Sequence, residues 1–129
     1  MEIPKDVLRQ CVGLGLMACR LPSMREASLN IFEAVRIAAP DSAAWIIGMA
    51  MVYANADDDP GAACTFMAKH GVSAASGDLL ARAFLGLFLV MADRASEAEG
   101  VADAVVADAG DADATRLAKS LLDNEIRRR

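Results

Sequence analysis

The residues of this chain whose types could support chemistry do not form a recognisable catalytic set. The segment from Gly13 to Ala18 fits the GxGxxA pattern of dinucleotide-binding loops. Such a loop needs a β-strand before its glycines and a βαβ unit around them, because the pyrophosphate binds at the N-terminus of the helix that follows. The residues from Lys5 to Gln10 instead begin an expected helix. We therefore expect no dinucleotide cofactor.

Two other patterns suggest metal binding or acid–base catalysis but lack the partners they need. Asp57, Asp59 and Gly61 resemble a calcium loop, but that loop's internal glycine and final glutamate are missing, and Pro60 interrupts it. His70 is the only histidine and precedes a glycine at an expected helix end, so a capping role fits it better than catalysis. The sequence predicts a protein that is not an enzyme and uses no cofactor and no metal.

Composition and charge narrow the class further. A chain of 129 residues with 55% hydrophobic content suits a single helical domain that spans residues 1–129. The formal net charge is -5, and the only basic cluster is Arg127-Arg128-Arg129, which argues against a nucleic-acid or anionic-membrane partner. Cys11, Cys19 and Cys64 form no CxxC pair, so we expect reduced thiols in apolar surroundings.

Neither a signal peptide nor a membrane span is expected. The first residues, Met1 to Asp6, carry acids and a proline where a signal peptide needs a basic start and then an apolar stretch. The most apolar stretches, Ala43 to Ala54 and Ala83 to Ala92, are shorter than the roughly 20 residues of a membrane-spanning helix. We expect a cytoplasmic protein.

Capping and turn residues divide the chain into helices, with no competing strand pattern. Ser23 and Glu26 form an expected capping box, and Pro40 stops the helix that follows. The other boundaries come from acids and serines at helix starts and from Gly or Pro at their ends. The expected helices cover 6–20, 23–39, 42–54, a short helix from the 57–61 turn to 70, 78–93, 96–109, and 111 or 113 to 126.

Three of these helices share a Leu-Gly or Ile-Gly pair and are each followed by an Ala-centred helix. In tetratricopeptide repeats, this glycine lets the second helix of a pair approach the first, and a small residue about twelve positions later marks the contact. Ala27 follows Gly15 and Ala98 follows Gly86 at that spacing, whereas Ala63 lies fifteen residues after Gly48. The sequence predicts an all-α fold, a short α-solenoid of about three degenerate tetratricopeptide-like helix pairs plus a C-terminal helix. An ordinary helical bundle remains the alternative.

Over nearly its whole length, this layout resembles the tetratricopeptide-type needle-subunit chaperones of bacterial type III secretion, the YscG group, and their Hrp-associated relatives of plant pathogens. The resemblance implies a bacterial, cytoplasmic virulence chaperone that acts in protein transport. Its concave groove would hold an apolar helix of a small secreted subunit and prevent premature polymerisation, sometimes with a second small co-chaperone. The motifs that carry the resemblance are Leu14-Gly15 with Ala27 and Ala34, Ile47-Gly48, and Leu85-Gly86 with Ala98.

Independently of the resemblance, the residues expected to face the groove are all apolar or aromatic. The opposite sides of the same helices, including Leu85 and Leu89, are needed for packing against the second helices, so the helices must be buried on both sides. An apolar face of this extent marks an interface, and a helix laid along it is the recognition mode that fits. The predicted partner-binding residues are Val12, Leu16 and Cys19, then Trp45, Met49, Val52 and Tyr53, then Ala83, Leu87, Val90 and Met91.

Three alternatives for this face stay open. The chain's own last helix, from Asp113 to Ile126, could cover it. A second copy could cover it in a homodimer, because self-coverage and partner coverage bury similar residue types. A general interaction scaffold that docks extended peptides is the third, although the expected groove offers only Arg9 and Arg20 at one margin for binding a terminal carboxylate.

Overall fold

The computed structural model describes residues 14–15 and 21–127, and over these residues it is helical with no β-strand. The all-α prediction is thus confirmed for the described part of the chain. The chain divides into two compact units, Met1–Ala63 (unit 1) and Cys64–Arg129 (unit 2). The prediction that residues 1–129 form one domain stays a prediction.

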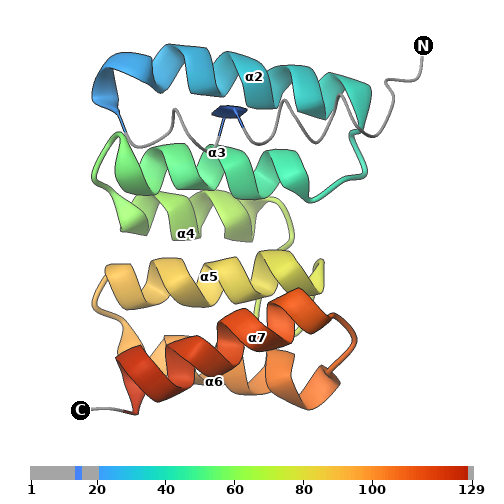
Figure 1. Cartoon of the computed structure of the whole chain (residues 1–129), viewed down its shortest axis with the longest axis vertical. Coiled ribbons are helices and arrows are strands. Elements are labelled where there is room, and N and C mark those ends of the chain that lie inside the picture. The colour runs from blue at the N-terminus through green and yellow to red at the C-terminus, as the bar shows by residue number, and fades with distance from the viewer. Residues whose placement is uncertain (1–13, 16–20, 128–129) are drawn as a thin grey trace. The chain divides into compact units, whose positions relative to one another are not determined.

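Unit 1 contains the 3-10 helix η1 (Pro22–Met24), α2 (Arg25–Ala38), α3 (Ala44–Asn55) and the start of α4 (Pro60–Lys69) (Figure 1). Helix α2 ends before Pro40, as predicted. Ser42 Oγ accepts a hydrogen bond from the Ala44 amide at 3.1 Å, and Asp59 Oδ1 accepts one from the Ala62 amide at 3.0 Å. These side chains bind amides that have no partner within the first turn of a helix.

The predicted capping box at Ser23 is wrong. Residues Pro22–Met24 form a 3-10 turn, and α2 begins after Met24 with no side-chain cap. Glu26 instead accepts a hydrogen bond from Arg25 Nη1 at 2.7 Å, while Arg25 Nε binds Asp57 Oδ1 at 2.6 Å. The proline favours a tight turn at this point because its ring fixes φ near the helical value.

The core of unit 1 is built around Phe32 of α2, whose side chain is 0% exposed. A Cβ atom added to Gly48 of α3 would overlap the Phe32 ring, and one added to Gly15 would lie 2.6 Å from Phe32 Cζ. Val52 is also fully buried and forms the centre of this cluster with Phe32. The ring therefore fits only because both facing positions are glycine.

The predicted contact between Gly15 and Ala27 is displaced by one residue. Ala27 and Ala34 are exposed, whereas Ser28 is 0% exposed and its Oγ donates to the Gly15 carbonyl oxygen at 3.1 Å. The hydrogen bond satisfies the serine hydroxyl, so its burial carries no large penalty. The repeat spacing of twelve residues predicts Ala27, whereas the contact is made by another small residue, Ser28, at the next position.

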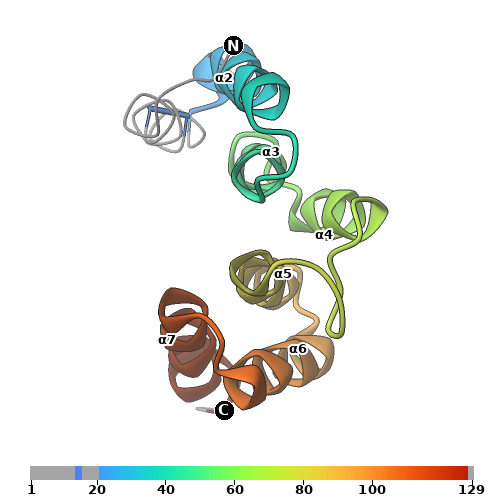
Figure 2. The same ribbon diagram turned by 90° about the vertical axis from the view of Figure 1, so that its right-hand side faces the viewer.

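Unit 2 contains the rest of α4, then α5 (Leu79–Met91), α6 (Ala95–Asp108), α7 (Ala112–Leu121) and the π-helical turn η2 (Leu122–Ile126). Helices α5, α6 and α7 pack against one another (Figure 2). Asp78 and Asp111 cap α5 and α7, accepting hydrogen bonds from the Ala81 and Ala114 amides. These starts agree with the boundaries predicted from the acids.

Helix α4 ends at the predicted place through a glycine. Gly71 has φ +83°, its amide donates to the Ala68 carbonyl, and the Val72 amide donates to the Met67 carbonyl. This is the Schellman arrangement, in which glycine adopts the left-handed conformation without steric cost. His70 lies at the C-cap, where its amide donates to the Phe66 and Met67 carbonyls, and its ring packs 4.5 Å from that of Phe66.

In unit 2, Gly86 of α5 is where neighbouring helices come close. A Cβ atom at Gly86 would lie 3.4 Å from Leu121 of α7 and 3.8 Å from Val101 of α6. Ala98, the predicted small partner on α6, is 0% exposed. The glycine therefore faces bulky side chains from two helices.

The glycine at position 48 provides a direct test of this packing. We expect Gly48→Ala to lower the free energy of unfolding by about 1–3 kcal/mol, because the new methyl group overpacks the core against Phe32. Gly100→Ala is the matched control. It lies in α6 with no heavy atom within 4 Å of its new methyl group, so it should raise stability by about 0.5–1 kcal/mol through helix propensity. Urea unfolding measures both, and an unchanged Gly48→Ala midpoint would contradict the packing described here.

Candidate functional site

One side of α5 carries an accessible row of apolar side chains, which we call the α5 stripe: Leu80, Phe84, Leu87 and Met91. The first three are half-buried, and Met91 is 42% exposed. Their spacing of i, i+4, i+7 and i+11 places them along one side of the helix. The only charged residue of α5, Arg82, lies on the other side and donates from Nε to the Gly77 carbonyl at 3.0 Å. The stripe therefore contains no charge.

Most of the other side chains of α5 are buried. Ala81, Leu85, Phe88 and Leu89 are buried on one flank, and Ala83 and Gly86 on the other. The Phe84 and Phe88 rings lie 6.3 Å apart at an interplanar angle of 37°. The aromatic residue of the stripe, Phe84, is thus next to the buried Phe88 ring. The helix that carries the stripe therefore has buried side chains on both flanks.

The predicted partner-binding residues fall into three groups. Leu87, Val90 and Met91 lie on accessible parts of α5, and Met49 and Tyr53 of α3 are half-buried. Trp45, Val52 and Ala83 are buried at 8%, 0% and 0% exposure. Val12, Leu16 and Cys19 lie outside the described residues.

The buried members of the predicted set have structural roles. Val52 packs with Phe32 in the core, and Trp45 Nε1 donates to the Pro40 carbonyl at 3.1 Å. Spacing from Gly48 does not separate core from groove on α3, because this helix is apolar on all sides. Leu80 and Phe84 were missed, although their spacing from Leu87 and Met91 could have identified them.

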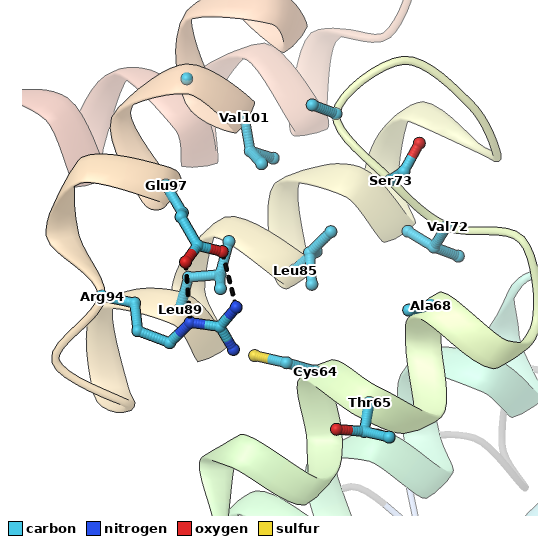
Figure 3. A pocket seen from close by; sticks show the side chains of 12 residues that line it. Cys64, Thr65, Ala68, Val72, Ser73, Leu85, Leu89, Arg94, Glu97 and Val101 are labelled. Atoms are coloured by element: carbon cyan, nitrogen blue, oxygen red, sulfur yellow. Dashed lines mark hydrogen bonds and ion pairs between the residues drawn. The ribbon is translucent and has the colours of Figure 1, made fainter.

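Unit 2 also has a hollow on the opposite side of α5 from the stripe. This pocket has a volume of about 600 Å³ and is formed by α4, the loop that follows it, α5 and α6 (Figure 3). Leu85 and Leu89, which were expected only to pack against neighbouring helices, contribute to its lining. This pocket was not predicted from the sequence.

Arg94 and Glu97 form an ion pair at the edge of the pocket. Arg94 Nε and Nη2 donate to the two carboxylate oxygens of Glu97 at 3.1 and 2.6 Å. Figure 3 shows Cys64 Sγ pointing toward the Arg94 guanidinium. Burial raises the pKa of the Cys64 thiol, the Arg94 charge opposes that shift, and Glu97 adds to it. The thiol is therefore protonated near neutral pH and behaves as a small apolar group.

The acids and the histidine first considered for chemistry have other contacts. Asp57 binds Arg25 and Asp59 caps α4, while the His70 ring packs against Phe66. Within the described ranges, no group of three or more His, Cys, Asp and Glu side chains could hold a metal ion. No described helix is long and apolar enough to cross a membrane.

Comparisons of the chain with protein-family models, with curated proteins and with solved structures find no match. The α5 stripe and the pocket behind it are therefore interpreted from their own geometry.

The electrostatics around Cys64 predict the behaviour of its thiol. At about pH 8, Cys64 should react with iodoacetamide more slowly than a small free thiol, because a raised pKa reduces the thiolate fraction. Arg94→Gln should slow the reaction further, and Glu97→Gln should speed it. Peptide-resolved mass spectrometry separates Cys64 from Cys11 and Cys19. Rate changes in the same direction for both variants would contradict the assigned charges.

The same shift has a consequence for stability. The folded pKa of Cys64 lies above that of the unfolded thiol, so folding favours the protonated form. The contribution of this thiol to the free energy of unfolding is fully present below the unfolded pKa and is lost as the pH rises through the folded pKa.

Proposed function

We propose that this chain is a non-catalytic chaperone that holds an apolar helix of a small secreted subunit against the α5 stripe and prevents the subunit from polymerising too early. The observation that carries the proposal is the uncharged row of Leu80, Phe84, Leu87 and Met91, which lies on a helix already packed on both flanks. An accessible apolar surface on a well-packed element is typical of a protein-binding site.

The dimensions of the stripe favour a helical partner. Eleven residues of α-helix at about 1.5 Å per residue give a row roughly 16 Å long, which matches about three turns of a second helix. A partner helix with apolar residues at i, i+3, i+4 and i+7 can place its side chains between those of the stripe. Met91 has a flexible thioether side chain, which suits an interface that adapts to its partner.

The assignment to secretion rests on the resemblance to the needle-subunit chaperones. The close approach of the Phe32 ring to Gly15 and Gly48 supports a tetratricopeptide-like pairing of helices as part of this proposal. Under this proposal the chain acts in the bacterial cytoplasm as part of virulence-related protein transport. A second small co-chaperone would bind elsewhere on the chain.

A charge placed in the stripe tests the proposal. We expect Leu87→Asp to weaken the partner complex by more than tenfold, because the interface would bury an unpaired carboxylate. Met91→Asp should act in the same direction, and since Met91 is exposed, this variant should fold normally. Ala107→Asp introduces the same charge at an exposed position of α6 and is the matched control. The measurement is affinity purification from the native cell, followed by titration with the isolated helix of the recovered partner.

The proteins recovered in this purification distinguish a chaperone from a homodimer and from a general scaffold. Recovery of one small helical protein in stoichiometric amount, lost in both stripe variants and kept in Ala107→Asp, supports the chaperone. Recovery of a second copy of the chain, lost in the same variants, supports a homodimer instead. Recovery of a large assembly that is indifferent to Leu87 supports a general scaffold and contradicts the role of the stripe.

A further inference from the structure

The pocket between α4, α5 and α6 has the size and lining of a small-molecule site. Its volume of about 600 Å³ lies within the range of roughly 300–1,000 Å³ that is typical of ligand pockets. Apolar side chains form most of its lining, and the protonated Cys64 thiol adds to that apolar surface. The aliphatic lining residues come from three helices and the loop after α4: Ala68, Val72, Ala74, Leu85, Leu89 and Val101.

A glycine keeps one side of the pocket open. Gly100 lies in the middle of α6 and lines the pocket, and no heavy atom lies within 4 Å of where its Cβ would be. Glycine is the least favourable residue inside a helix apart from proline. Neither close packing nor a left-handed backbone requires it here, unlike Gly48 or Gly71. Its effect on the structure is to leave space beside the apolar lining.

The charge at the edge of the pocket indicates the polar group of the ligand. Arg94 is the only basic residue that lines the pocket, and Glu97 is the only acidic one. Their side chains are 46% and 58% exposed, so their ion pair is worth little in water and can be exchanged. A carboxylate is the group whose geometry matches two parallel guanidinium donors.

We propose that this pocket binds a small carboxylic acid with an apolar body, which lies against Leu85 and Leu89 while its carboxylate replaces that of Glu97 on Arg94. The site is independent of the proposed chaperone function, because the stripe occupies the opposite side of α5. Binding at the pocket therefore does not need a protein partner.

The probe is decanoate, with decanol and decylamine as neutral and cationic ligands of the same length. Isothermal titration calorimetry on the full chain should show that decanoate binds more tightly than either of them. Arg94→Gln should weaken decanoate binding at least about tenfold, since it removes a charge-assisted bidentate contact, and Arg94→Lys should weaken it less. Glu97→Gln should tighten binding by about two- to fivefold, because it removes the competing carboxylate.

Two further variants locate the ligand. Gly100→Leu places a bulky side chain in the open space next to the Gly100 Cα atom and should abolish binding. It should not lower the melting temperature, because leucine favours a helix more than glycine does. Arg116→Gln removes an arginine from another i,i+3 ion pair, with Asp113 on α7, and should leave binding unchanged. Bound decanoate should also protect Cys64 from alkylation, as resolved by peptide mass spectrometry.

The result that supports the site is carboxylate-selective binding that is weakened in Arg94→Gln, tightened in Glu97→Gln, lost in Gly100→Leu and kept in Leu87→Asp. No decanoate binding, equal binding of decanol or decylamine, or binding that persists in Gly100→Leu would overturn the proposal. None of these results would bear on the α5 stripe, so the two proposals fail independently.

Discussion

The close approach of the Phe32 ring to two helical glycines is the constraint on which the packing of unit 1 depends. In unit 1 the Phe32 ring occupies the space that Gly15 and Gly48 leave open, and a single methyl group at either position would collide with it. Dispersion contacts of this density weaken when the separation grows by even a fraction of an ångström. The absence of a side chain at Gly15 and Gly48 thus determines how closely Phe32 packs against them. In unit 2 the approach to Gly86 is less tight, because a Cβ atom there would make ordinary van der Waals contacts with Leu121 and Val101.

Helix α5 of unit 2 is apolar on nearly every side. Two flanks are buried against α6 and α7, and the hydrophobic effect accounts for the residues there. Burial within the chain does not explain the apolar residues of the α5 stripe, because Met91, its last residue, is 42% exposed. Its apolar character is explained when a partner helix supplies the missing cover. The proposed partner helix would therefore bury the apolar side chains that the helices of the chain leave accessible.

Much of the secondary structure could be predicted, because local signals determine it. Asp78, Asp111 and Gly71 end or begin helices where their chemistry predicts. The wrong predictions concern positions whose surroundings depend on contacts between helices. Ser28 replaces Ala27 at the close contact because its hydroxyl finds the Gly15 carbonyl, a partner that spacing alone cannot reveal.

The candidate sites were less predictable than the helices. Leu87, Val90 and Met91, which were predicted to bind a partner, lie on accessible parts of α5. Val52 instead belongs to the core, because it packs with Phe32 of another helix. The pocket was missed entirely. The pocket forms only where α4, α5 and α6 come together. In the sequence, nothing distinguishes Gly100, which lines the pocket, from other glycines in helices.

Site-specific photo-crosslinking from position 91, in cells that produce the protein, tests whether the α5 stripe binds a separate protein. A photoreactive phenylalanine analogue at Met91 should form a crosslink to a different, small protein, through an apolar face of one of its helices. The same analogue at Glu99, which is exposed on α6, should not. Crosslinks from position 91 only to the chain itself or to a second copy would contradict the account, because the stripe would then be covered without a partner.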